Sequence, residues 1–153
     1  MIKILSLHEK RKIEQQLEEQ FGIKEIPGEI IAWGSERLLL FTGEAEKYEL
    51  EKIIESAALE KIGVYFAKVI NGELKLTIEG SQILNEQIKK NIFEIDDEQA
   101  EEWMMGRELN ISTGMKGFVV VKNKENYLGC GKASEYKITN FIPKERRLKN
   151  REK

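Results

Sequence analysis

Apolar residues near the N-terminus follow a helical pattern. From Ile13 to Phe21 they recur at every fourth position, which places them on one face of a helix. Ser6 is followed three residues later by a glutamate, the spacing of a capping box, and Gly22 stands where a helix commonly ends. The pattern therefore predicts an amphipathic helix over residues 7–20.

The segments that follow have the composition of strands. Residues 29–41 hold two short apolar runs separated by Gly34-Ser35, and the second run suits a buried strand. Two further runs, 62–70 and 73–78, are joined by Asn71-Gly72, which suits the positive backbone angles of a type I′ turn. Apolar and polar residues alternate in the later run, so we expect a hairpin with one buried face.

Helical patterns return between and after these strands. Gly43 opens a stretch in which apolar residues from Leu50 to Ala58 share one helix face, and residues 81–90 favour a short helix. We place the boundary between two domains near residues 89–91, although no flexible linker marks it.

The last third of the chain combines short strands with one short helix. Asp96 can cap a helix over residues 97–105, which Gly106 would end. Trp103 lies in that helix, where packing in a core is a more common role than stacking on bases. Strands are expected at residues 91–95, 117–122, 127–132 and 134–139. Several short strands within about 60 residues suggest a small β-barrel or a curled sheet.

The overall composition is that of a soluble globular protein. Hydrophobic residues make up 41% of the 153 positions and charged residues 34%, unlike disordered or membrane proteins. No apolar run approaches the roughly 20 residues of a membrane span, and we expect no signal peptide at the N-terminus. Cys130 is the only cysteine, so no internal disulfide can form and a cytoplasmic location is the default expectation.

Charge is distributed unevenly along the chain. Residues 116–153 contain eleven Lys or Arg and four Glu, a net charge of +7, so the remainder carries −9 of the total of −2. A basic end on an acidic body favours a polyanionic partner, usually nucleic acid, although a solvated tail without a partner is the alternative. We expect residues 141–143 to anchor the start of this tail. The basic set is Lys132, Lys137, Lys144, Arg146, Arg147, Lys149 and Arg151.

Residue types that catalysis and metal binding require are scarce. One histidine and one cysteine cannot supply a zinc site, and a nucleophilic pair of His8 with Cys130 would have to bridge the N-terminal helix and the barrel. Residues 129–132, Gly-Cys-Gly-Lys, lack the long loop of a P-loop, and their glycines are expected to allow close backbone approach. We therefore predict no catalytic residues, no metal and no cofactor, and that the protein is not an enzyme.

Several motifs of the last third occur in a fixed order. Residues 103–109 (Trp-Met-Met-Gly-Arg-Glu-Leu), 117–121 (Gly-Phe-Val-Val-Val) and 128–132 (Leu-Gly-Cys-Gly-Lys) resemble the core of a PUA domain, the RNA-binding barrel of pseudouridine synthases and archaeosine transglycosylases. Residues 137–148 resemble the ending of PUA-like tails attached to RNA 5-methylcytosine methyltransferases. Upstream, residues 61–80 are similar to the domain that precedes PUA in small ribosome-biogenesis factors.

This resemblance implies a fold and a site. The fold would be α+β, with an N-terminal α/β pre-PUA-like domain, residues 1–90, packed against a C-terminal PUA-like pseudo-β-barrel with a basic tail, residues 91–153. In PUA proteins RNA generally lies against the short helix, the adjoining strand and nearby loops. The resemblance therefore implicates Gly106, Arg107, Lys116 and Gly117, with Lys132 on the core strand. With the charge pattern added, the predicted RNA-binding residues are Arg107, Lys116, Gly117, Lys132, Lys137, Lys144, Arg146 and Arg147.

The favoured function is non-catalytic binding of structured RNA, rRNA or tRNA, in ribosome assembly or RNA modification. A basic barrel with a tail can supply the phosphate and 2′-hydroxyl contacts by which structured RNA is recognised. The alternative is a protein-interaction module that docks an RNA methyltransferase or an assembly factor through the acidic N-terminal domain. No membrane partner is expected, and an enzyme of unrecognised type is the third hypothesis.

Overall fold

The computed structural model describes residues 2–43, 46–55 and 63–149. Its strands are β1 Ile2–Ile4, β2 Glu29–Trp33, β3 Arg37–Phe41, β4 Val64–Ile70, β5 Glu73–Leu76, β6 Ile92–Glu94, β7 Gly117–Asn123, β8 Asn126–Ala133 and β9 Ile138–Asn140. Its α-helices are α1 Leu7–Phe21, α2 Lys47–Glu55, α4 Ile78–Ile83 and α5 Asp97–Met104, and its 3-10 turns are η1 Asn85–Gln87 and η2 Lys144–Arg146.

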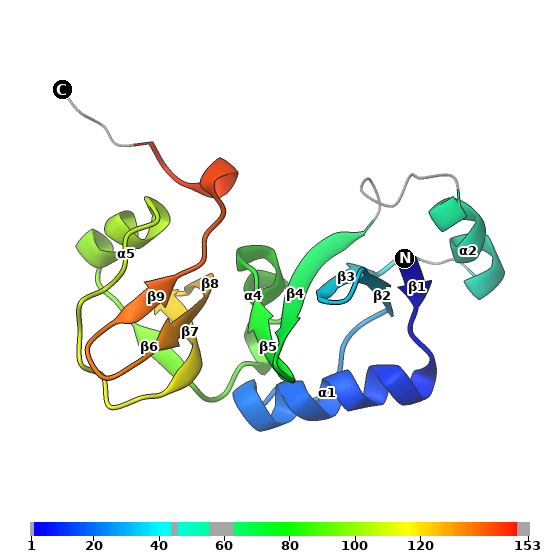
Figure 1. Cartoon of the computed structure of the whole chain (residues 1–153), viewed down its shortest axis with the longest axis horizontal. Coiled ribbons are helices and arrows are strands. Elements are labelled where there is room, and N and C mark those ends of the chain that lie inside the picture. The colour runs from blue at the N-terminus through cyan, green and yellow to red at the C-terminus, as the bar shows by residue number, and fades with distance from the viewer. Residues whose placement is uncertain (1, 44–45, 56–62, 150–153) are drawn as a thin grey trace.

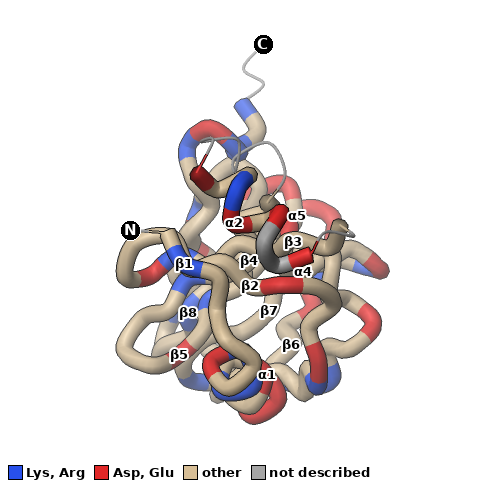
Figure 2. Tube along the Cα trace, turned by 90° about the vertical axis from the view of Figure 1, so that its right-hand side faces the viewer, with Lys and Arg blue, Asp and Glu red and all other residues tan. Residues whose placement is uncertain are grey.

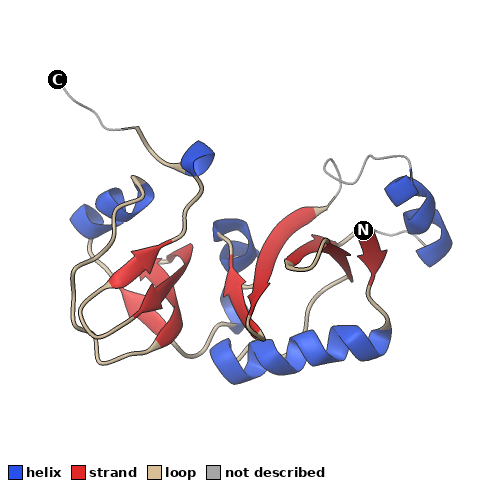
Figure 3. Cartoon of the chain, in the orientation of Figure 1, coloured by secondary structure: helices blue, strands red, loops and turns tan. Residues whose placement is uncertain are grey.

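The strands form two sheets, and the protein is a mixed α/β protein. One sheet has the order β1-β2-β3-β4-β5 and the other the order β6-β7-β8-β9. The sheets lie side by side along the longest axis of the molecule, with α1 beneath the five-stranded sheet and α4 between the two (Figures 1 and 3). No helix among the described residues is long and apolar enough to cross a membrane.

Helix α1 has the N-terminal cap and the C-terminal glycine that the sequence predicted. The Glu9 amide donates to Ser6 Oγ at 3.2 Å, and the Ser6 amide donates to Glu9 Oε1 at 2.9 Å, so the capping box is complete. Gly22 ends the helix with φ of 78°, a backbone angle that glycine adopts without strain. Leu17 and Phe21 are fully buried under the five-stranded sheet. The predicted amphipathic helix is confirmed.

The hairpin of β4 and β5 is also confirmed, but its second strand ends early. Asn71 and Gly72 have φ of 51° and 81°, as a type I′ turn requires. The strand predicted as far as residue 78 ends at Leu76, because Thr77 caps a helix by accepting a hydrogen bond from the Gly80 amide at 2.9 Å. The helix predicted at 81–90 therefore begins at Ile78 instead.

The helix predicted after Gly43 is present as α2. Its Leu50 is fully buried and packs in a cluster with β1, β2 and β3 residues. Two of the residues predicted for its apolar face, Ala57 and Ala58, lie outside the described residues, as does Ile62 at the start of the predicted strand 62–70.

The four-stranded sheet is built around one hairpin. β7 and β8 are antiparallel, with Asn123 opposite Asn126, so Lys124 and Glu125 make a two-residue turn. β6 lies parallel to β7 on one side, and β9 lies antiparallel to β8 on the other. The last strand is shorter than predicted, because the Ser134 amide donates to the Lys137 carbonyl at 2.9 Å and closes a turn before it.

Helix α5 is held against this sheet by its tryptophan. Trp103 is fully buried, and its indole Nε1 donates to the Leu128 carbonyl at 3.1 Å. Gly131 permits this approach, since a Cβ there would lie 2.6 Å from Trp103 Cη2. The predictions of a packing role for Trp103 and of close approach at the glycines of β8 are both confirmed.

The two sheets share a hydrophobic core. One cluster of buried residues contains Leu74 and Leu76 of β5 together with Phe118 of β7 and Cys130 of β8. The Leu76 amide donates to Cys130 Sγ at 3.2 Å. Helix α4 adds a polar contact, because the Gly129 amide donates to the buried Ser81 hydroxyl at 3.0 Å. The junction between the sheets is therefore packed and hydrogen-bonded.

Candidate nucleic-acid interface

Strand register gathers several of the predicted RNA-binding residues at one end of the four-stranded sheet. Gly117 at the start of β7 lies opposite Ala133 at the end of β8, and Ala133 lies opposite the first residue of β9. Lys116, Lys132 and Lys137 therefore all stand at the sheet end away from the Lys124-Glu125 turn. We call this region, with Gly117 included, the open end of the sheet.

The lysines of the open end differ in their partners. Lys137 Nζ forms an ion pair with Glu108 Oε1 at 3.2 Å. Lys132 is exposed, and its Nζ lies 5.6 Å from the centroid of the Phe118 ring, a cation–π contact. Lys116 is exposed as well. Within the described part of the chain, neither Lys116 nor Lys132 has a carboxylate at ion-pair distance.

Arg107 and Arg147 lie together at the C-terminal end of α5. Gly106 there has φ of 90°, and a Cβ on it would collide with the Arg147 guanidinium. Arg147 Nε donates to the Ile142 carbonyl at 2.8 Å. The Arg147 side chain therefore connects two parts of the tail and also lies against Gly106 at the end of α5. Arg107 forms an ion pair with Glu102. Exposed pairs of this kind contribute only about 0–1 kcal/mol, so a phosphate can compete for the arginine.

The start of the tail packs against the rest of the protein, as the apolar residues 141–143 predicted. Ile142 is buried in the core beneath α5, and the Leu148 amide donates to the Met104 carbonyl at 2.8 Å. Arg146 reaches in the other direction and pairs with Glu79 of α4. Lys144 is exposed, and no partner for it is found among the residues described. Arg151, also in the predicted basic set, lies outside them.

The basic end is less uniformly positive than its net charge indicated. Figure 2 shows acidic positions among the basic ones near the C-terminal end of the trace. Helix α5 is acidic, and its Asp97 carboxylate pairs with Lys124 Nζ at 3.0 Å, which lowers the pKa of Asp97. Among the described residues from 116 onward, the Lys and Arg side chains without a carboxylate at ion-pair distance are Lys116, Lys122, Lys132, Lys144, Arg147 and Lys149.

Three basic residues that the sequence did not predict for an RNA-binding surface lie beside the tail in the structure. Arg37, Lys68 and Lys75 line a groove of about 440 Å³ between the two sheets, which Arg146 and Phe141 close from the tail side. These residues were counted with an acidic N-terminal body, and a charge sum along the chain cannot show that they meet. The alternation in residues 73–78 did place Lys75 on the polar face of its strand.

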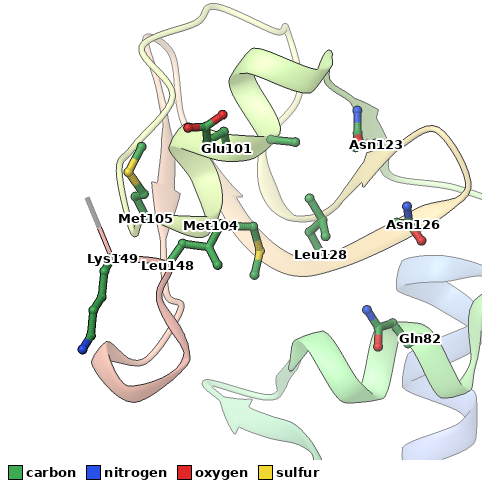
Figure 4. A pocket seen from close by; sticks show the side chains of 10 residues that line it. Gln82, Glu101, Met104, Met105, Asn123, Asn126, Leu128, Leu148 and Lys149 are labelled. Atoms are coloured by element: carbon green, nitrogen blue, oxygen red, sulfur yellow. The ribbon is translucent and has the colours of Figure 1, made fainter. Parts of the chain in front are cut away.

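A second cavity, of about 600 Å³, lies between α4, α5 and the tail. Figure 4 shows Met104, Leu128 and Leu148 on its apolar side and Asn126 and Gln82 opposite them. Its lining contains one carboxylate, Glu101, and one amine, Lys149, whose Nζ points away from the other labelled side chains (Figure 4). This lining contains no pair of a nucleophile and a base of the kind that covalent catalysis needs.

Cys130 is a packing residue. It is buried at the junction of the sheets, and this burial raises the pKa of its thiol to about 12, so the reactive thiolate is scarce at neutral pH. His8 is exposed on α1, under the other sheet. Among the described residues, no group of three or more His, Cys, Asp or Glu is placed to hold a metal ion.

We expect the Cys130 thiol to resist a thiol-reactive dye in the native chain and to react fully once urea unfolds it. The reason is that reaction requires exposure of a buried thiol and its conversion to the thiolate. Absorbance of the released dye, followed at pH 8 with glutathione as the exposed control, measures both. Reaction of the native protein at the rate of glutathione would contradict this placement.

Together these features define a mixed α/β protein whose small sheet carries exposed lysines suited to a polyanion. The comparisons with known proteins are more specific. Residues 90–148 match the family model described as the methyltransferase RsmF PUA domain. Residues 90–148 are therefore similar to the PUA domain of RsmF, and the predicted resemblance to the PUA-like tails of RNA methyltransferases is confirmed.

The similarity to curated proteins extends over most of the chain. The ribosomal RNA small subunit methyltransferase F of Vibrio campbellii is 29% identical over 143 residues, which cover 90% of this chain and 29% of the relative. Its counterpart in Shewanella oneidensis is 28% identical over 137 residues, covering 88% and 27%. That of Shewanella halifaxensis is 30% identical over 95 residues, covering 61% and 19%. The chain thus spans less than a third of the length of these relatives.

The prediction that the protein is not an enzyme is wrong. The relatives are named as methyltransferases, which are enzymes, and the similarity runs through both sheets of this chain. The prediction was made because these 153 residues contain no recognisable catalytic motif. Because the matched region is less than a third of each relative, the absence of such motifs from it does not bear on the activity of these proteins.

Proposed function

We propose that this chain binds structured RNA of the small ribosomal subunit, and that this binding serves methylation of that RNA. The observation that carries the proposal is the presence of exposed lysines without carboxylate partners, Lys116 and Lys132, within a segment that matches the RsmF PUA domain. Unpaired lysines at fixed positions on a sheet can neutralise phosphates and release their counterions.

The proposed RNA surface begins at the open end of the sheet and continues over the end of α5 to the tail. Structured RNA is recognised mainly by its shape and by contacts to phosphates and 2′-hydroxyls, which such a surface can supply. Its residues are those that the sequence predicted, namely Arg107, Lys116, Gly117, Lys132, Lys137, Lys144, Arg146 and Arg147. The structure supports different roles for them, because Arg147 also holds the tail in place.

The domain organisation belongs to the same proposal. Residues 1–90 would form a pre-PUA-like α/β domain and residues 91–153 the PUA-like pseudo-β-barrel with its tail. The separate five-stranded and four-stranded sheets support this division. The shared core around Leu76 and Cys130 supports packing of one domain on the other.

Replacing Lys116 and Lys132 together by alanine should weaken binding to a small-subunit rRNA transcript by roughly tenfold or more at about 0.1 M salt. The slope of log affinity against log salt should fall by about 2, because two phosphate contacts are lost. Fluorescence anisotropy with labelled transcript at several salt concentrations measures both quantities, and a tRNA transcript tests the choice of RNA.

Lys124→Ala is the control, because it removes a lysine that is paired with Asp97 at the opposite end of the same hairpin. We expect it to change the affinity and the salt slope little. If Lys124→Ala lowered the affinity and the salt slope as much as the double substitution does, the binding would be a general attraction between charges and not a site at the open end of the sheet. If the unaltered chain bound neither RNA, the proposed function would fail, and docking of a protein partner through the N-terminal domain would become the better hypothesis.

A further inference from the structure

We propose that the groove between the two sheets, which we call the junction groove, binds a phosphate of the same RNA. The RNA would then run from the open end of the four-stranded sheet across to the five-stranded sheet. This inference rests on the proposed function and extends it to residues outside the PUA match, namely Arg37, Lys68 and Lys75. Three observations support it.

The first observation is a row of like charges across three strands. Arg37 of β3 lies directly opposite Lys68 of β4, and Lys68 lies directly opposite Lys75 of β5. Like charges at directly opposite positions destabilise a sheet. Only one of the three cations has a carboxylate at ion-pair distance among the described residues, since Lys68 Nζ lies 3.6 Å from Glu36 Oε1. A bound phosphate would relieve this repulsion.

The second observation is the environment of Lys75. Its side chain is half-buried, and its Nζ lies 4.4 Å from the centroid of the Phe141 ring. Burial, and then the neighbouring Lys68, lower the pKa of Lys75. The ring offers only a weak partner for a partly desolvated ammonium, and an anion in the groove would complete its charge balance.

The groove as a whole remains positive. Its lining includes four Lys or Arg and two Glu, which leaves a net charge of +2. One of these carboxylates, Glu79, is engaged by Arg146. A volume of about 440 Å³ is within the range of sites for small ligands, so a phosphate with its sugar can enter.

The third observation is continuity with the proposed RNA surface. Lys75 Nζ makes a cation–π contact with the Phe141 ring, and Lys132 Nζ makes one with the Phe118 ring. The centroids of the two rings are 6.2 Å apart. Two lysines thus flank a pair of aromatic rings that links the open end of the sheet to the groove. Since a backbone phosphate recurs along the whole RNA, one strand can contact both lysines.

Lys75→Met tests the inference, because methionine keeps an unbranched apolar stem and removes the charge. We expect the affinity for the small-subunit rRNA transcript to fall by roughly fivefold to tenfold at about 0.1 M salt and the salt slope to fall by about 1. The urea midpoint should stay the same or rise, because one member of a repulsive row is gone. Lys75→Arg should retain most of the binding.

Lys122→Met is the matched control, because Lys122 is also half-buried and its Nζ lies 5.2 Å from the centroid of the Tyr127 ring, at the other end of the hairpin. If Lys75→Met left RNA binding unchanged while the double substitution of Lys116 and Lys132 weakened it, the proposed phosphate site in the junction groove would be wrong. The proposed function would then still stand. Equal losses from Lys75→Met and Lys122→Met would also overturn the phosphate site. A chain that bound no RNA at all would overturn both.

Discussion

Replacing Trp103 with alanine is expected to lower the free energy of unfolding by about 3–5 kcal/mol. Trp103 is fully buried, and its loss would leave a cavity between α5 and the four-stranded sheet. It would also leave the Leu128 carbonyl without its indole donor. The cavity lies beneath the helix end that holds Arg107 and the tail, so RNA binding should weaken together with stability. Urea unfolding followed by circular dichroism measures the first effect.

The control for this substitution is Tyr136→Ala. Tyr136 is 71% exposed, and a change at an exposed position typically alters stability by no more than about 0.5 kcal/mol. Trp103→Phe should fall between the two, because it retains an aromatic ring and loses the hydrogen bond to Leu128. A loss below about 1 kcal/mol for Trp103→Ala would show that α5 is not held by this side chain.

Replacing Gly80 with alanine is expected to destabilise the protein by about 1–3 kcal/mol. A Cβ at Gly80 would collide with the backbone carbonyl of Phe66 in β4, which also accepts a hydrogen bond from the Thr77 amide at 3.0 Å. Because backbone atoms cannot rotate away, α4 would have to move off the sheet. The same helix contacts β8 through Ser81, so the junction between the sheets would be disturbed.

Whether Gly80→Ala raises or lowers the free energy of unfolding shows whether α4 packs closely on β4. In an exposed helix, alanine is more favourable than glycine by about 1 kcal/mol, so a helix free of the sheet would be stabilised. Urea unfolding of Gly80→Ala distinguishes the two outcomes. Ile83→Ala in the same helix is the control, because Ile83 is 43% exposed and its truncation should cost little. A more stable Gly80→Ala variant would contradict the close packing of α4 on β4.

Much of the fold could be predicted because its signals are local. The capping box at Ser6, the turn at Asn71-Gly72 and the cap at Asp96 each involve residues within a few positions of one another. The error at the end of β5 is instructive. Apolar alternation ran on to Ile78, but Thr77 caps a helix there, and Ile78 is buried from that helix instead. Alternation alone cannot distinguish these two placements.

The candidate site could be predicted only in outline. A charge count along the chain found the basic residues, since it needs no contacts. It could not find their partners, because Lys137 pairs with Glu108 and Arg146 with Glu79, each far away in sequence. It also missed Lys75, whose exposure to a groove depends on the neighbouring sheet.

The amino-acid sequence by itself determined the caps of α1 and α5, the turn at Asn71-Gly72, the order of the PUA-like motifs and the basic character of the C-terminal part. Each of these depends on neighbouring residues or on residue type alone. Only the tertiary structure decided which cations are free, that Cys130 is a packing residue, and that Arg37, Lys68 and Lys75 form a row beside the tail. The physical reason is that burial, ion pairing and strand register join residues far apart in the chain, and no local pattern specifies which of them meet.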